Sequence, residues 1–421
     1  MNAESQKRME SKRPTNMKMR KKSSRIEDLE VAVMMADNKT TVVLGCKNRF
    51  LVERNRGIND LRKPSMVRDV GFVGALLFGS GGRCDSVPGI YILGDSLVDV
   101  GNNNHLPLSI LKANFPHNGL DFPTGKPTGR FSNGKNAADF LAEKVGLPTA
   151  PPYLSLASEG KKLGSTNVTV TGVSFASGGA GILNGTKFFF QSITLENQVG
   201  YYSEVHDQLV QLLGSDGARA HLAKCLFLIV VGSNDIFAYY HKNSELPSQY
   251  TPQQYVDLMT STLKQLMKRL YELGARKFVV TGVGAIGCCP IQRLKNTTNG
   301  CMEKTNNWSM EYNKGLQIML KELKLESSDI NYSYFDIFGV MSDLIQDPKI
   351  TETKEACCGL GKLKANIPCI PVSTYCTNRS DHLFWDLVHP TEMVSHVFAD
   401  LLYSGSRRYM HPINVQKLVN M

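Results

Sequence analysis

The chain has 421 residues, of which 42% are hydrophobic and 20% are charged, a composition typical of a globular protein with one large α/β domain or two smaller ones. Its net charge of +10 is unevenly distributed, because residues 1–65 carry 16 Lys and Arg against 8 Asp and Glu, whereas the rest carries 32 against 30. No nucleic-acid motif and no interleaving of aromatic and basic residues accompanies the basic segment. We therefore expect residues 1–65 to be a basic, unordered extension, with no nucleic-acid partner.

The next segment, residues 66–87, resembles a signal sequence in the order of its parts. Arg68 precedes the nine-residue apolar run VGFVGALLF at 70–78, and small residues follow at 79–82. The run is too short to span a bilayer as a helix, and no other stretch approaches the length that a spanning helix needs. A buried strand or helical turn is the alternative reading. We favour a signal sequence that starts near Met66 and leaves a mature chain beginning between roughly residues 80 and 88.

Apolar runs alternate with amphipathic stretches from residue 88 onward. The run LFLIVV at 226–231 is apolar throughout, which is typical of a strand buried on both faces of a parallel sheet. The alternation predicts one three-layer α/β domain with a parallel sheet over residues 88–421. Strands are expected at 90–93, 172–176, 226–231, 277–283 and 332–335, and helices at 136–145, 191–213, 252–273, 302–325 and 391–402.

Ten cysteines are more than a cytosolic enzyme of this size usually carries. There is no Cys-x-x-Cys pair, and His382 and His389 are not spaced from a cysteine pair as zinc ligands are, so no metal site is expected. Disulfides fit better, and Cys289–Cys301 and Cys369–Cys376 are plausible pairs among the eight cysteines from Cys225 onward. Seven Asn-x-Ser/Thr sequons also permit glycosylation of a secreted protein. They lie at Asn38, Asn167, Asn184, Asn296, Asn307, Asn331 and Asn378.

Residues capable of acyl-transfer chemistry follow the predicted strands. In a parallel α/β sheet, ligands bind at the carboxyl ends of the strands. A hydroxyl, a glycine turn with free N–H groups, a side-chain amide and a carboxylate–imidazole pair are the components of a nucleophilic ester-cleaving site. The four segments are GDSL at 94–97, ASGGAG at 176–181, GSND at 232–235 and DLVH at 386–389.

Each of these segments alone has an ordinary structural explanation. Gly-Asp-Ser is a common turn or helix cap, Asn234-Asp235 could be a turn, and Asp386 with His389 could be a surface pair. The glycines at 178–181 are not a phosphate-binding P-loop, since no Gly-Lys-Ser/Thr follows them. The nucleophile elbow of the α/β-hydrolases, Gly-x-Ser-x-Gly, is absent from the chain. The occurrence of all four segments in order is what favours a catalytic site.

Five sequence blocks resemble the plant-type GDSL esterase/lipases of the SGNH hydrolase superfamily. The resemblance spans roughly residues 88–405, nearly all of the chain outside the N-terminal extension. Cys357-Cys358-Gly359 and the later Cys376 are also similar to the family pattern. The blocks are ILGDSLVDVGNNN at 92–104, DFPTGKPTGRFSNG at 121–134, FASGGAGI at 175–182, VGSND at 231–235 and FWDLVHPTE at 384–392.

The resemblance implies a flavodoxin-like α/β/α sandwich around a five-stranded parallel sheet, and hydrolysis of carboxylic esters without a metal or organic cofactor. Ser96 matches the family nucleophile, whose backbone N–H also serves the oxyanion hole. Gly178 matches the glycine donor, with Gly179 as an alternative, and Asn234 matches the side-chain donor. Asp386 and His389 match the acid and the base.

Two other functions use the same fold or the same residues. An acyltransferase would pass the acyl group to an alcohol with the same triad, and the sequence does not separate it from a hydrolase. A secreted lipid- or glycan-binding glycoprotein could share the fold without catalysis, although a pure binder need not retain all five site residues. We expect a monomeric, secreted enzyme whose substrate is a small-molecule or lipid ester and whose mature form has no membrane span.

Overall fold

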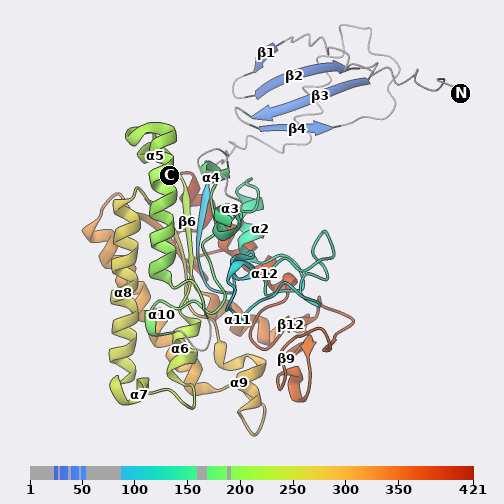
Figure 1. The fold of residues 1–421 in the computed structure, drawn as a ribbon, viewed down its shortest axis with the longest axis vertical. Coiled ribbons are helices and arrows are strands. Elements are labelled where there is room, and N and C mark those ends of the chain that lie inside the picture. Colours follow the sequence, from blue (N-terminus) through green and yellow to red (C-terminus); the bar gives the residue numbers. More distant parts are fainter. Residues whose placement is uncertain are drawn as a thin grey trace, which may run out of the picture. The chain divides into compact units, whose positions relative to one another are not determined.

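The computed structural model describes residues 87–158, 168–186 and 191–421, together with the backbone of four strands between residues 23 and 53. The chain divides into two compact units, Met1–Cys84 and Asp85–Met421. Figure 1 draws both units. The segment 66–87, for which the sequence predicts a signal function, lies almost entirely outside the described residues.

An antiparallel sheet with the strand order β1-β2-β3-β4 lies in the first unit. That residues 1–65 form an unordered extension stays a prediction. The two longest strands are rich in Val, Leu, Thr and Met, and β-branched residues favour extended backbone. The strands are β1 (Ser23–Ile26), β2 (Leu29–Ala36), β3 (Lys39–Cys46) and β4 (Arg49–Glu53).

The second unit is built around a mostly parallel sheet with the strand order β13-β8-β7-β6-β5. Strands β5 (Ile90–Gly94), β6 (Leu226–Val230), β7 (Lys277–Thr281) and β8 (Asn331–Phe335) run parallel, and β13 (Met410–Pro412) pairs antiparallel with β8. Every residue of β5, β6 and β7 is buried, as expected for strands covered on both faces.

Two parts of this sheet differ from the expected five parallel strands. The segment 172–176 runs beside β5 but forms only isolated bridges, at Ser174 with Ile92 and with Pro152. Backbone hydrogen bonds still join Ile92 to Val173 and Phe175. Gly172, however, has φ of +119°, outside the extended region, so a regular ladder does not begin there. The edge strand β13 was not predicted, because three residues carry no usable periodicity.

Helices cover both faces of this sheet, which confirms the expected α/β sandwich. Figure 1 shows α5 and α8 on one side of the strands, and α2 and α12 on the other. Well-formed caps fix several of these helices: Asn136 closes a capping box with Asp139, and Thr251 does so with Gln254. The helices are α2 (Ala137–Lys144), α3 (Tyr153–Ser158), α4 (Val168–Thr171), α5 (Leu195–Leu222), α6 (Ser233–Tyr239), α7 (Leu246–Gln249), α8 (Pro252–Glu272), α9 (Pro290–Leu294), α10 (Glu303–Glu326), α11 (Ile337–Gln346), α12 (Glu392–Ser404) and α13 (Val415–Val419).

Short elements occupy residues 102–135 and 348–385, which connect the longer helices and strands. They are η1 (Asn102–His105), β9 (Glu352–Ala356), β10 (Cys358–Gly359), η5 (Lys362–Lys364), β11 (Thr374–Tyr375) and β12 (His382–Phe384), and two further short helices, η3 (Asn184–Thr186) and η4 (Ile286–Cys288), lie elsewhere. Within the described part of the chain, no helix combines the length and apolarity needed to cross a membrane.

Candidate active site

Ser96, His389 and Asp386 lie together at the carboxyl edge of the sheet, although 293 positions separate the serine from the histidine. The distance between Ser96 Oγ and His389 Nε2 is 2.7 Å. His389 Nδ1 lies 2.8 Å from each carboxylate oxygen of Asp386. A carboxylate can only accept, so the imidazole donates from Nδ1 and leaves Nε2 to accept the serine proton. The geometry is that of a serine, a base and a base-orienting acid.

The turn that carries Ser96 follows directly from β5. Gly94 has φ of +154°, and a Cβ at this position would lie 2.2 Å from the carbonyl oxygen of Val230, so only glycine fits. The buried Gln198 side chain binds the same residue twice, accepting from the Gly94 N–H and donating to its carbonyl oxygen, both at 2.8 Å. Sequence analysis missed Gln198. The available signal was a polar residue on the buried face of α5, between Leu195 and Tyr202.

The turn from Trp385 to His389 is held by its own hydrogen bonds. The Trp385 N–H donates to the His389 carbonyl oxygen at 2.8 Å and closes the turn. Asp386 Oδ1 accepts from the backbone N–H groups of Val388 and His389 at 3.0 and 2.9 Å. Burial alone would raise the pKa of Asp386, but the adjacent His389 and these hydrogen bonds outweigh it and hold that pKa below its usual value. Asp386 therefore stays ionised beside His389.

A cluster of two disulfides packs against Trp385, the first residue of this turn. Its bonds are Cys357–Cys376 and Cys358–Cys369, and the fully buried Trp385 packs among them. The Cys357 N–H donates to the carbonyl oxygen of Phe384 at 2.9 Å, and the Cys358 N–H donates to that of Trp385 at 2.7 Å.

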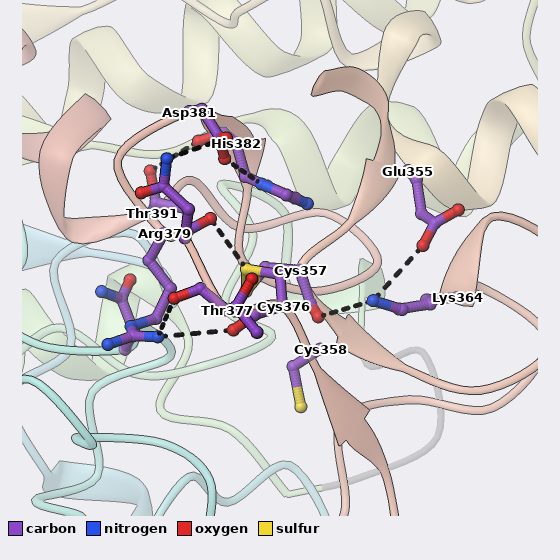
Figure 2. Close-up of a disulfide and its surroundings, with 12 residues drawn as sticks. Glu355, Cys357, Cys358, Lys364, Cys376, Thr377, Arg379, Asp381, His382 and Thr391 are labelled. Carbon is purple, nitrogen blue, oxygen red and sulfur yellow. Dashed lines mark hydrogen bonds and ion pairs between the residues drawn. A yellow bond between two sulfur atoms is a disulfide. The ribbon is translucent and has the colours of Figure 1, made fainter. Parts of the chain in front are cut away.

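Side chains from the same segment surround the cluster, as Figure 2 shows. Lys364 donates to the Cys357 carbonyl oxygen at 3.3 Å and pairs with Glu355. Arg379 donates to the carbonyl oxygen of Cys376, also at 3.3 Å. The cluster thus connects residues 355–379 to the strand that precedes Asp386.

The expected disulfide pairs, Cys289–Cys301 and Cys369–Cys376, are both wrong. Cys301 pairs with Cys288 instead, and the neighbouring Cys289 is a buried free thiol whose Sγ lies 3.7 Å from the Val388 carbonyl oxygen. The side chains of consecutive residues point in different directions, so the Cys288 side chain faces Cys301 and the Cys289 side chain faces the core. Which of two adjacent cysteines faces the partner is a tertiary property that spacing does not reveal.

The glycine turn at 177–180 lies beside η1. The Ala180 N–H donates to the Ser177 carbonyl oxygen and closes the turn, with Gly179 at φ +83° in a conformation that glycine adopts readily. The Gly178 N–H, expected as an oxyanion donor, instead donates to Asp99 Oδ2 at 3.0 Å. The Gly179 N–H, the expected alternative, has no hydrogen-bond partner among the described residues.

Asn234 is the second residue of α6, which starts immediately after β6. Its Nδ2 donates one hydrogen bond, to the Ala180 carbonyl oxygen at 2.9 Å, and so has a second N–H left. The adjacent Asp235 accepts from the N–H groups of Ile182 and Leu183, at 2.9 and 3.1 Å. These bonds hold Asn234 against the glycine turn. The expected donors of Ser96 and Asn234 therefore lie at neighbouring strand ends.

Three buried aspartates organise the loops of the site. Burial raises the pKa of Asp95 to about 7, opposed in part by a hydrogen bond from the Leu97 N–H and by His389. Burial likewise raises the pKa of Asp99 to about 6 against the N–H donors that it accepts. Burial also raises the pKa of Asp235. Asp99 lies within the motif at 92–104, and residue spacing alone does not reveal that it binds Gly178.

Phe131 covers the imidazole of His389, with ring centroids 5.0 Å apart. Its neighbour Arg130 is fixed by a buried bidentate pair with Asp139, at 2.6 and 2.7 Å. The segment that carries the second family block therefore packs onto the histidine. Among the described residues, no group of three or more His, Cys, Asp or Glu side chains is arranged to hold a metal ion.

Residues 90–402 match the family model of the GDSL-like lipase/acylhydrolases. The chain belongs to this family. A GDSL esterase/lipase of Arabidopsis thaliana is 47% identical over 346 residues, which are 80% of this chain and 92% of that protein. GDSL esterase/lipase 7 of the same plant is 35% identical over 349 residues, 79% of this chain and 92% of that protein. As a GDSL family member, the protein is a carboxylic ester hydrolase.

A solved structure also aligns with much of this chain. The acetylxylan esterase of Geobacillus stearothermophilus, solved as a catalytic mutant, aligns over 75% of this chain and 93% of its own. The sequence identity is 13% and the TM-score is 0.33.

Proposed function

We propose that the GDSL protein hydrolyses carboxylic esters, of acyl lipids or other acyl compounds, through an acyl-enzyme formed on Ser96. The observation that supports this most is the continuous hydrogen-bonded line from Ser96 Oγ through His389 to Asp386, at 2.7 and 2.8 Å. A serine hydroxyl is a weak nucleophile until a base accepts its proton, and this line supplies the base with its orienting acid.

The reaction proceeds in two halves. Ser96 Oγ attacks the ester carbonyl carbon while its proton passes to His389 Nε2. The tetrahedral intermediate collapses, the acyl–oxygen bond breaks, and the alcohol leaves with the proton from His389. Water then attacks the acyl-enzyme, again giving a proton to His389, and the carboxylic acid is released as Ser96 recovers its proton.

The oxyanion of each intermediate needs preorganised donors. We assign these to the N–H of Ser96 and the side-chain amide of Asn234, together with the Gly179 N–H. Gly178 is the less suitable glycine, because Asp99 already accepts its N–H. Removing one such donor typically lowers kcat by about 10²–10³-fold. We therefore expect Asn234→Ala to lower kcat strongly while Ser96 still reacts with a fluorophosphonate probe.

We further infer that the protein is secreted and glycosylated. The three disulfides of the second unit support an oxidising compartment. Of the described sequons, Asn184, Asn307 and Asn378 are exposed to solvent, as a glycosylated asparagine must be.

Hydrolysis of p-nitrophenyl acetate by single and double variants tests the proposal. Ser96→Ala and His389→Ala should each abolish most activity, and the double variant should be scarcely worse than either, because the two residues serve the same step. Near-additive losses, or near-wild-type turnover by Ser96→Ala, would show that the chemistry does not run through this pair. Circular dichroism of each variant controls for loss of fold.

A further inference from the structure

A cavity with a volume of about 50 Å³ lies directly beside Ser96 and is partly open to solvent. All of its polar lining residues belong to the reacting site or adjoin it: Asp95, Ser96, Ser233, Asn234 and His389. No Lys, Arg or Glu is among the residues that line it. The polar groups that could bind an ester carbonyl are therefore gathered in one part of this cavity.

The rest of the lining is apolar and buried. Ile286 and Ile337 are each 6% exposed, Phe398 is 5% exposed and Val394 is fully buried. A sugar or a charged group placed against these side chains would lose its hydrogen bonds to water without replacement. A hydrocarbon chain loses nothing there and gains from leaving water. The lining thus selects an aliphatic group.

The cavity extends across the strand ends, away from Ser96. Ser96 follows β5, Asn234 follows β6, Gly284 follows β7, and Met341 lies on α11, which follows β8. These strands are consecutive neighbours in the sheet. The Met341 side chain packs against Gly284 at the end of β7, and two spacings of about 4.8 Å place it roughly 10 Å from the serine end. An aliphatic chain attached at Ser96 would point along this row toward Met341.

Met341 occupies space that a glycine leaves open. A Cβ added to Gly284 would lie 2.3 Å from Met341 Sδ, so the thioether packs against the glycine backbone. The side chain is 8% exposed and unbranched, and methionine fills irregular gaps by rotating about its bonds. Its position therefore determines how far the cavity continues.

We propose that this cavity binds the aliphatic acyl chain of the ester, and that Met341, seated on Gly284, sets the chain length that the enzyme accepts. The proposal rests on the ester hydrolysis at Ser96 proposed above. The acyl group stays attached to Ser96 after the alcohol has left, so the acyl-enzyme keeps this group beside the cavity.

A chain-length profile with one leaving group tests the assignment. The probes are p-nitrophenyl acetate, butyrate, octanoate and laurate, compared by kcat/KM. Met341→Ala should raise the laurate-to-acetate ratio on the order of tenfold, because each additional buried methylene contributes about fourfold. Gly284→Ala should lower the same ratio by pushing the thioether into the cavity. Met310→Ala, at an exposed methionine on α10, is the matched control and should leave the profile unchanged.

Two results would overturn the proposal. One is an unchanged acyl profile in Met341→Ala and Gly284→Ala proteins that retain wild-type melting temperatures. The other is a change in kcat/KM of these variants that depends on the length of the alcohol, measured with acetates of methyl to octyl alcohol, and not on the length of the acyl chain. If Met341→Ala does not fold, Met341→Leu, which changes the shape but little of the volume, replaces it and should still alter the profile.

A binding measurement separates this proposal from the proposed function. Octanoic acid should bind to the Ser96→Ala protein by calorimetry, and Gly284→Ala should weaken that binding several-fold. Absence of ester hydrolysis by the wild-type protein, with octanoic acid still bound in this way, would refute the catalytic proposal alone. Hydrolysis without any binding of octanoic acid would refute the acyl-chain cavity alone.

Discussion

At the residue scale, the site depends on side chains that have no chemistry of their own to perform. Gln198 satisfies both backbone groups of Gly94, and Asp99 accepts from Gly178 and from the N–H groups of Gly101 and Asn102. Buried backbone groups without such partners would cost about 1–3 kcal/mol each. These contacts fix the turns beside Ser96 before any substrate arrives.

Asp95 gives the site a defined pH dependence of stability. Its folded pKa is about 7, above the value of about 3.9 in an unfolded chain. Between about pH 4 and pH 7, the carboxyl group of Asp95 is protonated in the folded state and ionised in the unfolded state. The free energy of unfolding therefore falls as the pH rises through this range. Asp95→Asn cannot ionise, and its amide oxygen can still accept from the Leu97 N–H.

We expect Asp95→Asn to gain stability relative to wild type between pH 5 and pH 8. Each pKa unit corresponds to about 1.4 kcal/mol, so the gain is on the order of a few kcal/mol before relaxation and water access reduce it. Melting curves across this pH range measure it, with exposed Asp216→Asn as the control. A difference in melting temperature that is constant with pH would contradict the raised pKa of Asp95.

At the element scale, the disulfide cluster acts on the site through the backbone of β12 and Trp385. The N–H groups of Cys357 and Cys358 bind the two residues that precede Asp386. The double variant Cys358→Ala/Cys369→Ala should lose about 3 kcal/mol of stability, since its bond closes a short loop. The double variant should also have a lower kcat, because the backbone that binds Phe384 and Trp385 is then less firmly held, and the turn that carries Asp386 and His389 follows these residues.

A comparison of two double variants tests this connection. Urea unfolding and p-nitrophenyl acetate turnover would be measured for the variant above and for exposed-loop Asn366→Ala/Ile367→Ala, which leaves all cysteines in place. Equal turnover in the disulfide variant and in wild type, after correction for the folded fraction, would mean that the cluster contributes stability only.

The elements near the site were predictable where their apolar periodicity is uninterrupted, whereas the long helix α5, predicted at 191–213, runs from Leu195 to Leu222 across a break at Gly214. Helices α8 and α10 agree with their predicted spans within one or two residues, because their apolar periodicity runs through many turns. The segment 172–176 is not a regular strand, because Gly172 has φ of +119° and its backbone lies directly against the Ile90 carbonyl oxygen. Such a contact depends on the tertiary fold, and the same is true of the Cys288–Cys301 pairing and of the bond from Gly178 to Asp99.

The residues of the candidate triad were predictable for a different reason. A nucleophile, a base and its orienting acid must occupy strand ends or the turn before a helix, and these places can be located from apolar runs. The residues that hold them in position, Gln198 and Phe131, obey no spacing rule. They make contacts across the fold that only the coordinates reveal.

At the scale of the whole molecule, the second unit contains every residue of the candidate site. The apolar run at 70–78 and the small residues that follow it predict cleavage before this unit begins. N-terminal sequencing of the protein collected from the medium of secreting cells should give a first residue between roughly 80 and 88. Recovery of residues 1–65 on secreted, active protein would contradict this.

Labelling with a fluorophosphonate, followed by peptide mapping, shows directly whether Ser96 is the nucleophile. We expect one labelled serine, Ser96, with labelling abolished by His389→Ala and retained, at a lower rate, by Asn234→Ala. The label on any other serine, or labelling of Ser96 that is unaffected when His389 is removed, would contradict this expectation.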